Sequence, residues 1–291
     1  MLDFGLAFAG PLPLPPFSVL GFVIEPFGAL AAVAIVVGFS VAHARARVLG
    51  LSENVLTRLC IIAVVAGFSG SHLVYVFGYA PQTIVDDPLY LLKIWTGMSS
   101  VGGWIGGYVG VAMYFAFHRR IPFLPYADAI AYGLAFAWVF ARAGCWVSFD
   151  HPGLVTDLFI GMEYPGSASL TAGVRHNVGF YEFLWCLLIA GIFFSQRDRI
   201  HFKGWYMTVF ILAYVPFRFP IDFLREVDAR YLGLSPGQWL LPGFASVLMA
   251  LAIRERRRAD LLIPDGIPKP EFFPDGAVPA PVSPDDSRPA P

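Results

Sequence analysis

Charged residues are scarce in this chain. Aspartate, glutamate, lysine and arginine make up 14% of its 291 residues, whereas hydrophobic residues make up 57% and the mean hydropathy is +0.63. Soluble domains carry about 25% charged residues, so this composition excludes a soluble globular protein. The formal net charge is only -1, and no basic stripe or nucleic-acid motif is present, so DNA and RNA are excluded as partners.

Cysteine is also rare. The three cysteines, Cys60, Cys145 and Cys186, are odd in number, lie in apolar stretches and have no metal-ligand or redox spacing. We therefore expect no disulfide, no metal site and no cofactor. The amino terminus has an acidic residue, Asp3, where a signal peptide would carry basic residues, and prolines interrupt its apolar run. We expect a short segment at the membrane surface that leads into the first span.

Long apolar runs dominate the rest of the sequence. A helix that crosses a bilayer needs about 20 apolar residues, and a spanning segment must pair all its backbone groups internally. Seven runs meet this requirement, and none alternates as a strand would. The sequence therefore predicts an all-α polytopic membrane protein with seven transmembrane helices, centred on Pro26–Ala42, Leu59–Tyr79, Gly102–Phe117, Ala129–Phe149, Val178–Gln196, Gly204–Phe219 and Gly237–Ile253.

The distribution of basic residues predicts the orientation, because lysine and arginine near span ends are retained in the cytoplasm. Twelve of them lie on one side: Arg45, Arg47, Arg58, Arg119, Arg120, Arg197, Arg199, Lys203, Arg254, Arg256, Arg257 and Arg258. The other side has only Lys93, Arg175, Arg225 and Arg230. With seven spans, the amino terminus is then outside and the carboxyl terminus is cytoplasmic.

Two regions lie outside this pattern of spans and short loops. The segment between spans four and five, about 150–177, is too long for a plain connection, so we expect a small cap on the outer face. The stretch from Pro264 to Pro291 contains nine prolines and little that can form a core. We divide the chain into a membrane domain, 1–258, and a disordered proline-rich cytoplasmic tail, 259–291.

Glycines are concentrated at the start of the third span, in VGGWIGGYVG. Gly102, Gly106 and Gly110 are separated by four residues, as are Gly103 and Gly107, which is the small-xxx-small pattern of closely packed membrane helices. We expect close helix packing here. An additional interpretation is that the bare backbone at Gly102 and Gly103 leaves room for a lipid tail or exposes amide groups.

Two arginines, Arg142 and Arg218, interrupt apolar runs. A guanidinium group cannot be neutralised, so within a bilayer it needs an anion, a polar cavity or water. Arg218, Asp222 and Arg225 have the spacing of one helical face, although Pro216 and Pro220 should kink or end the helix. These residues predict an irregular polar pocket that binds a phosphate-bearing substrate in the membrane.

Several further stretches resemble the bacterial prolipoprotein diacylglyceryl transferase family, in matching order from about Phe17 to Arg258. They are DPLYLLKIWTGMS (87–99), Gly102-Gly103, ARAGCWVSFDHPG (141–153), MEYPGS (162–167), RHNVGFYE (175–182), YVPFRFPIDFLREVD (214–228) and SPGQ (235–238). The resemblance implies a bacterial inner-membrane enzyme. Such an enzyme transfers the diacylglyceryl group of phosphatidylglycerol to the lipobox cysteine of a preprolipoprotein and releases glycerol 1-phosphate.

The resemblance also implies roles for individual residues. Arg142 and Arg218 match the arginines that bind phosphate in the family, Tyr214 matches its tyrosine, and Asp150 stands where the family has glutamate. We expect catalytic roles for Arg142, Arg218, His176 and Asp150. We expect contacts with phosphatidylglycerol or the signal peptide from Tyr214, Ser148, Gly102, Gly103, His72, Arg175, Glu182, Asp222 and Arg225.

Departures from the family pattern leave alternatives open. The family histidine that is proposed to accept the thiol proton is Val101 here, its two signature asparagines are Cys145 and Ser148, a tyrosine is Phe27 and an arginine is His72. Either His176 or His72 serves as the base, because imidazole titrates near neutral pH, or the chain is an impaired relative that only binds lipid or precursor. Two other hypotheses are a covalent intermediate on Cys145, activated by Arg142, and a small transporter.

Overall fold

Seven long helices form the body of the molecule. The computed structural model describes residues 13–19, 22–93, 96–118, 121–150, 152–166, 171–199, 201–226 and 229–261, without the side chains of 19 and 255–261. The long helices are α1 (Pro26–Val48), α2 (Glu53–Val74), α4 (Ser100–Phe117), α5 (Phe123–Ser148), α6 (Val178–Ser195), α7 (Trp205–Ile221) and α8 (Pro236–Leu261). All seven are long and apolar enough to cross a membrane. This confirms the seven predicted spans, whereas the predicted tail falls almost entirely outside the described residues.

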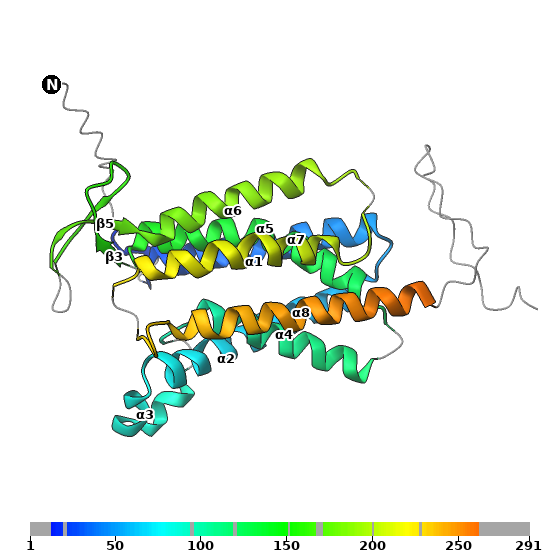
Figure 1. The fold of residues 1–291 in the computed structure, drawn as a ribbon, viewed down its shortest axis with the longest axis horizontal. Coiled ribbons are helices and arrows are strands. Elements are labelled where there is room, and N and C mark those ends of the chain that lie inside the picture. Colours follow the sequence, from blue (N-terminus) through cyan, green and yellow to red (C-terminus); the bar gives the residue numbers. More distant parts are fainter. Residues whose placement is uncertain are drawn as a thin grey trace, which may run out of the picture.

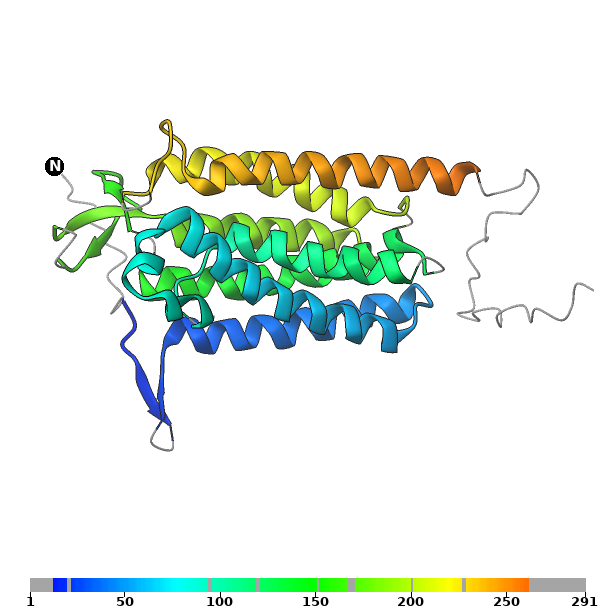
Figure 2. The same cartoon turned by 90° about the horizontal axis from the view of Figure 1, so that it is seen from below.

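The helices run side by side as a bundle (Figures 1 and 2). Helix α5 packs against α1, α6 and α7, α2 packs against α4, and α8 contacts both α4 and α7. A large cluster of buried aromatic and aliphatic residues joins α5, α6, α7 and α8, and a smaller cluster joins α1, α2, α4 and α5. Helix α8 therefore connects the α2–α4 pair with α7 on the other side of the bundle.

Close contact between α2 and α4 depends on glycine. A side chain at Gly106 would meet the Ala66 carbonyl oxygen at 2.2 Å and the Gly70 Cα at 2.8 Å, and one at Gly102 would meet the Gly70 carbonyl oxygen at 2.4 Å. A methyl group therefore has no room at either position. The prediction that this glycine stretch packs helices closely is confirmed.

Replacing Gly106 by alanine is expected to push α4 away from α2 and to destabilise the protein by about 1–3 kcal/mol, the usual cost of overpacking. The measurement is the thermal unfolding temperature of the purified protein in detergent. Gly191→Ala on α6 is the matched control, because a side chain there meets nothing within 4 Å. Equal unfolding temperatures for the two variants would contradict the argument.

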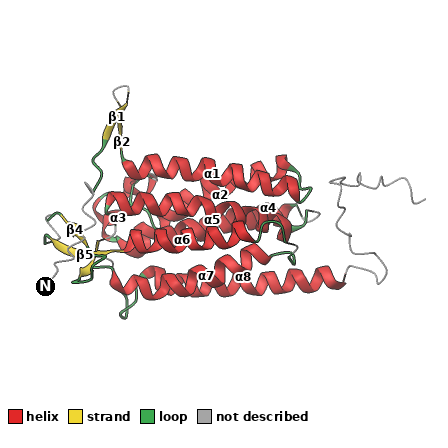
Figure 3. Cartoon of the chain, turned by 90° about the horizontal axis from the view of Figure 1, so that it is seen from above, coloured by secondary structure: helices red, strands yellow, loops and turns green. Residues whose placement is uncertain are grey.

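One end of the bundle carries most of the irregular structure, and we call it the sheet end (Figures 1 and 3). Between α5 and α6 lies an antiparallel sheet of β3 (Pro152–Val155), β4 (Met162–Tyr164) and β5 (Gly173–Asn177) in the order β3-β5-β4. A hairpin of β1 (Phe17–Val19) and β2 (Phe22–Ile24) precedes α1, and α3 (Gln82–Asp86) with the 3-10 turn η2 (Pro88–Leu92) follows α2. The sequence did not predict these strands, which qualify the all-α description.

Helix α7 is held at both of its ends. At its start, the buried Asp128 of α5 accepts hydrogen bonds from the backbone N–H groups of Gly204 (2.6 Å) and Met207 (3.1 Å), which caps donors that a helix start leaves unpaired. At its other end, α7 passes Pro216, ends one residue after Pro220 and continues as the 3-10 turn η3 (Asp222–Leu224). The prediction that these prolines kink or end the helix is confirmed by the end of α7 at Ile221.

Candidate active site

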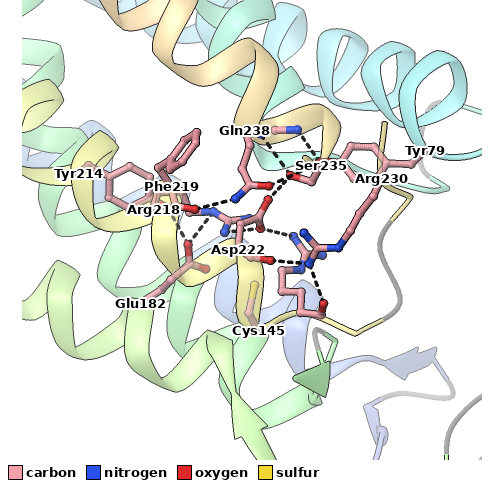
Figure 4. Close-up of polar contacts among 12 residues, drawn as sticks. Tyr79, Cys145, Glu182, Tyr214, Arg218, Phe219, Asp222, Arg230, Ser235 and Gln238 are labelled. Carbon is pink, nitrogen blue, oxygen red and sulfur yellow. Dashed lines mark hydrogen bonds and ion pairs between the residues drawn. The ribbon is translucent and has the colours of Figure 1, made fainter. Parts of the chain in front are cut away.

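Two buried arginines meet at one carboxylate near the sheet end. Arg142 of α5 and Glu182 of α6 form an ion pair of 2.9 Å, and Arg218 of α7 forms one of 3.0 Å with the same glutamate. The side chains of Arg142, Arg218 and Glu182 are 4%, 5% and 0% exposed. Three helices thus bring together two cations that the sequence places 76 residues apart, and Figure 4 shows Arg218 and Glu182 within this cluster.

Tyr214 completes the contact between these helices. Its hydroxyl accepts hydrogen bonds from Arg142 Nη2 at 2.8 Å and Trp138 Nε1 at 3.1 Å, and it donates to Glu182 Oε1 at 3.1 Å. The Trp104 ring stacks on Tyr214 at 4.9 Å, and Arg142 lies 5.3 Å from the centre of the Trp138 ring. Aromatic packing and hydrogen bonds therefore fix the orientation of both Tyr214 and Arg142.

A second carboxylate continues the cluster toward α8. Asp222 Oδ1 contacts Arg218 Nη1 at 2.5 Å and Arg225 Nη1 at 3.4 Å, so the predicted face of Arg218, Asp222 and Arg225 exists as a chain of ion pairs. Asp222 Oδ2 accepts a hydrogen bond from the hydroxyl of Ser235, which precedes α8. Glu182 and Asp222 thus link the guanidinium groups of Arg142, Arg218 and Arg225 into one chain of ion pairs.

Two narrow cavities border this cluster. One has an empty space of about 180 Å³ and is lined by Ser100, Val101, Trp104, Arg142, Tyr214, Arg218 and Leu241. The other has about 160 Å³ and is lined by Val101, Arg218, Phe219, Asp222, Gly237, Gln238 and Leu241. Both spaces are narrow and open to the surroundings, and neither has room for more than about one water molecule between its walls. A phosphate can therefore enter only if the side chains of the walls move apart.

Arg142 retains a hydrogen-bond donor. Its Nε is buried and has no hydrogen-bond partner among the described residues, although its two terminal nitrogens contact Glu182 and Tyr214. A buried donor without a partner costs free energy unless a ligand or water satisfies it. Chemically, the cluster can bind an anion through guanidinium groups that Glu182 and Tyr214 already hold in place.

The two histidines predicted as bases lie elsewhere in the described structure. Both ring nitrogens of the buried His72 face backbone carbonyl oxygens, Nδ1 that of Thr96 at 2.6 Å and Nε2 that of Tyr90 at 3.1 Å. His176 lies on β5 with its Nδ1 2.8 Å from the Tyr181 hydroxyl, and partial burial lowers its pKa. Neither histidine lines the two cavities.

The guanidinium of Arg175 contacts residues in and around the three-stranded sheet. Its side chain is 1% exposed, and its guanidinium donates to the Thr171 carbonyl and hydroxyl, to the Gly153 carbonyl at 3.1 Å, and to the carboxylate of Glu226. These partners join the loop before β5, strand β3 and the connection between α7 and α8. In this structure Arg175 therefore organises the sheet end.

The other predicted site residues are also placed outside the arginine cluster. Gly102 and Gly103 face α2, next to the cavity-lining Val101. Ser148 lies in the last turn of α5, and its hydroxyl is buried without a hydrogen-bond partner in the described part of the chain. Asp150 follows α5, where desolvation and the nearby Glu25 carboxylate raise its pKa to about 6. It therefore titrates closer to neutrality than an ordinary aspartate.

Cys145 lies next to Arg142, with its Sγ 3.8 Å from Nη1. The thiol is buried, and it is absent from the lining of both cavities. The predicted proximity of the two side chains is therefore present. A nucleophile must be accessible to its substrate, and nothing in this arrangement makes the Cys145 thiol accessible.

The sequence interpretation gave no role to four residues that the structure places at the site. Trp104 and Trp138 pack around Tyr214 and Arg142, and Ser235 and Gln238 contact the end of α7. A local signal existed only for the last pair, because Ser-Pro-Gly-Gln has the serine, proline and glutamine positions of a helix-capping box. The tryptophans carry no comparable sequence signal.

Comparison with known proteins adds independent information. A profile of the prolipoprotein diacylglyceryl transferase family matches residues 16–254. Phosphatidylglycerol–prolipoprotein diacylglyceryl transferases with similar sequences include that of Chromohalobacter salexigens, 28% identical over 79% of this chain and 86% of that protein. The enzyme of Pseudoalteromonas atlantica is 28% identical over 85% of this chain and 92% of its own length. That of Polynucleobacter asymbioticus is 32% identical over 67% and 76%.

Proposed function

Because this chain belongs to the prolipoprotein diacylglyceryl transferase family, we propose that it transfers the diacylglyceryl group of phosphatidylglycerol to the lipobox cysteine of preprolipoproteins. The relatives with similar sequences are named phosphatidylglycerol–prolipoprotein diacylglyceryl transferases. The observation that carries the proposal is the convergence of Arg142 and Arg218 on Glu182 at the wall of one cavity. A preformed pair of buried guanidinium groups suits a reaction in which a phosphate leaves.

The reaction is a displacement at a glyceryl carbon. The cysteine thiolate attacks this carbon, a carbon–sulfur bond forms, and the carbon–oxygen bond to the phosphate breaks. The electron pair of that bond leaves with glycerol 1-phosphate, and the thiol proton passes to a base or to water. Arg142 and Arg218 stabilise the negative charge that grows on the departing phosphate, which is the charge that increases in the transition state.

Glu182 and Tyr214 hold the two arginines in position for this step. Glu182 and Tyr214 hold the two terminal nitrogens of Arg142, which leaves its Nε for a ligand. Glu182 and Asp222 hold Nε and Nη1 of Arg218. Preorganised charges cost no reorientation during the reaction. We propose that Asp222 likewise holds Arg218 in position, and that Arg225 balances part of the negative charge of Asp222.

Orientation and location form part of the same proposal. The basic residues near the span ends favour an external sheet end and a cytoplasmic end for α8, in a bacterial inner membrane. Phosphatidylglycerol then enters from the membrane and the preprolipoprotein signal peptide from the outer face, with β3, β4 and β5 as the cap. The transporter and binding-only alternatives receive no support from the relatives' names.

The test is transfer by the purified protein in phosphatidylglycerol liposomes that contain a synthetic lipobox peptide. We expect a peptide whose mass increases by one diacylglyceryl group, with equimolar release of glycerol phosphate. Replacing the peptide cysteine by serine is the matched substrate control, and no product is expected from it. Folded protein that forms no thioether product, and that does not replace the enzyme in a transferase-depleted bacterium, would contradict the proposal.

A further inference from the structure

The start of α8 is tied to the end of α7 by reciprocal capping hydrogen bonds. Ser235 Oγ accepts a hydrogen bond from the Gln238 backbone N–H at 3.2 Å, and Gln238 Oε1 accepts one from the Ser235 backbone N–H at 2.9 Å. This is a capping box, in which serine and glutamine satisfy each other's backbone donors at a helix start. Pro236 occupies the first helical position, where its missing N–H costs nothing.

The same two side chains also bind the end of α7 and the turn η3, one residue and four residues after Arg218. Gln238 Nε2 donates to the Phe219 carbonyl oxygen at 2.9 Å, and the Ser235 hydroxyl donates to Asp222 Oδ2. Phe219 directly follows Arg218, and its carbonyl belongs to the last turn of α7, where a helix needs outside partners. A box that only capped α8 would not require these two contacts.

The hydrogen bond from Ser235 to Asp222 determines which oxygen of the Asp222 carboxylate is left to bind Arg218. One oxygen of the Asp222 carboxylate contacts Arg218 and Arg225. The other oxygen accepts the hydrogen bond from Ser235, and Figure 4 shows Ser235 and Arg218 beside Asp222. The Asp222 side chain is 2% exposed, so no solvent replaces a lost partner. Without the serine hydroxyl, the carboxylate can rotate toward its arginines and draw Arg218 away from Glu182.

These contacts lie at the wall of the smaller cavity. Arg218, Asp222 and Gln238 all line it, and a side chain at Gly237 would approach the Asp222 carboxylate at 3.6 Å and Val101 at 3.3 Å. The Gly237 backbone N–H donates to the Tyr79 hydroxyl at 3.1 Å, which also ties the start of α8 to η1 (Tyr75–Tyr79), the π-helical turn that follows α2. The capping box is therefore part of the cavity wall and has little freedom to move.

We propose that Ser235 and Gln238 are positioning residues, which act through Asp222 and the Phe219 carbonyl to set the direction of Arg218 toward the phosphate. The inference rests on the proposed transferase function for its kinetic consequence. Its consequence for binding does not depend on that function, because it concerns how strongly Arg218 binds a phosphate group. Chemistry and binding can therefore be measured independently.

The experiment compares Ser235→Ala with Ser235→Thr, which keeps a hydroxyl, and with Ser246→Ala as a control on the same helix. Ser246 is exposed, and its hydroxyl donates to the Pro242 carbonyl oxygen of its own helix. Hydrogen bonds to charged groups contribute about 10-fold to 100-fold in an equilibrium constant. We expect Ser235→Ala to lower kcat by about this factor with a smaller change in KM, because the aligned arginine acts mainly in the transition state. Ser235→Thr should remain within about 3-fold of wild type.

Gln238→Ala and Gln238→Glu test the second contact. Glutamate keeps the acceptor for the Ser235 N–H and loses the donor to the Phe219 carbonyl, so a purely capping role predicts normal kcat for Gln238→Glu. A positioning role predicts a loss similar to that of Ser235→Ala. Normal kcat in Ser235→Ala and Gln238→Glu, with only lower unfolding temperatures, would overturn the inference.

Binding of dihexanoyl phosphatidylglycerol, measured by calorimetry in detergent, separates the two proposals. If wild-type protein binds this lipid but forms no product, the proposed function fails, and weaker binding by Ser235→Ala than by Ser235→Thr still supports the positioning role. If wild type turns over and both serine variants match it in kcat and in binding, only the positioning role fails.

Discussion

Replacement of Arg142 by lysine is expected to lower diacylglyceryl transfer by about 10²-fold to 10³-fold, the usual effect of removing one donor that stabilises a developing oxyanion. Lysine keeps the charge but loses the planar fork. The guanidinium of Arg142 reaches Glu182 and Tyr214 with separate nitrogens, and its Nε has no hydrogen-bond partner in the described part of the chain. A single ammonium group cannot make these contacts and also face the phosphate. The measurement is the initial rate of product formation at saturating peptide.

Lysine is the informative substitution because alanine would leave Glu182 with one cation fewer in a buried site. Removing one partner of a buried ion pair costs about 3–5 kcal/mol, and loss of folding would then be mistaken for loss of catalysis. Arg254→Lys, an exposed position on α8, is the matched control and should keep the wild-type rate. An Arg142→Lys protein that is folded and fully active would show that this arginine has only a structural role.

The same substitution tests how Arg142 and Arg218 share the carboxylate of Glu182. Glu182 pairs with both arginines, so a weaker contact at Arg142 is expected to strengthen the one at Arg218. Phosphatidylglycerol binding should therefore fall less than turnover, because Arg218 remains in the cavity wall. Equal losses in binding and in turnover would indicate that Arg142 contributes mainly to ground-state binding.

The spans were predictable from the sequence because their signal is local. A run of about 20 apolar residues identifies a spanning helix wherever its partners lie, and the spacing of Gly102 and Gly106 indicates a close helix contact without naming the partner helix. The ion pair between Arg218 and Asp222 follows in the same way, since one helical turn separates the two residues. None of these features requires knowledge of the tertiary structure.

The site was only partly predictable, because it is assembled from distant segments. Residue spacing cannot show that Arg142 and Arg218 share Glu182, since this contact depends on how α5, α6 and α7 pack. The surroundings of His72 were equally hidden from the sequence. Its ring nitrogens face the Thr96 and Tyr90 carbonyl oxygens of the loop after α2, a contact that no local pattern indicates, and its role as a base stays a prediction.

The short strands escaped prediction for a different reason. Strands β1 and β2 have three residues each, which is too short for a period of two to be recognised. Strands β3 and β5 depend on contacts that Arg175 makes across the sheet end. Its guanidinium joins the loop before β5, strand β3 and Glu226, and its role in substrate binding stays a prediction.

Introducing histidine at Val101 is expected to raise the rate of transfer at pH 7 by about 10-fold to 30-fold. Val101 lines both cavities, and the resemblance to the family implies a proton-accepting histidine at this position. Neither cavity is lined by histidine in the described structure, so we expect the wild-type protein to depend on thiolate formed in water. A free cysteine has a pKa of about 8.5 and is a few per cent ionised at pH 7. A local base can therefore raise the reactive fraction by at most about 30-fold.

The wild-type protein and Val101→His should differ in how their activity depends on pH. Wild-type activity should rise as the pH increases toward about 8.5 and level off above it, because the thiolate is the nucleophile. In Val101→His the imidazole accepts the proton once it is neutral, so activity should already level off above about pH 6.5. The two rates should converge near pH 9.5, where solvent alone ionises the thiol.

Val101→Asn is the matched control, since asparagine is polar but has no titrating nitrogen, and it should follow the wild-type pH profile. A wild-type profile that is already flat between pH 6.5 and 9 would mean that another group in this chain takes the proton, and the gain on adding histidine would then disappear. Asp150, whose pKa is raised to about 6 at the end of α5, would become the residue to replace next. Its carboxylate is ionised and able to accept a proton throughout that pH range.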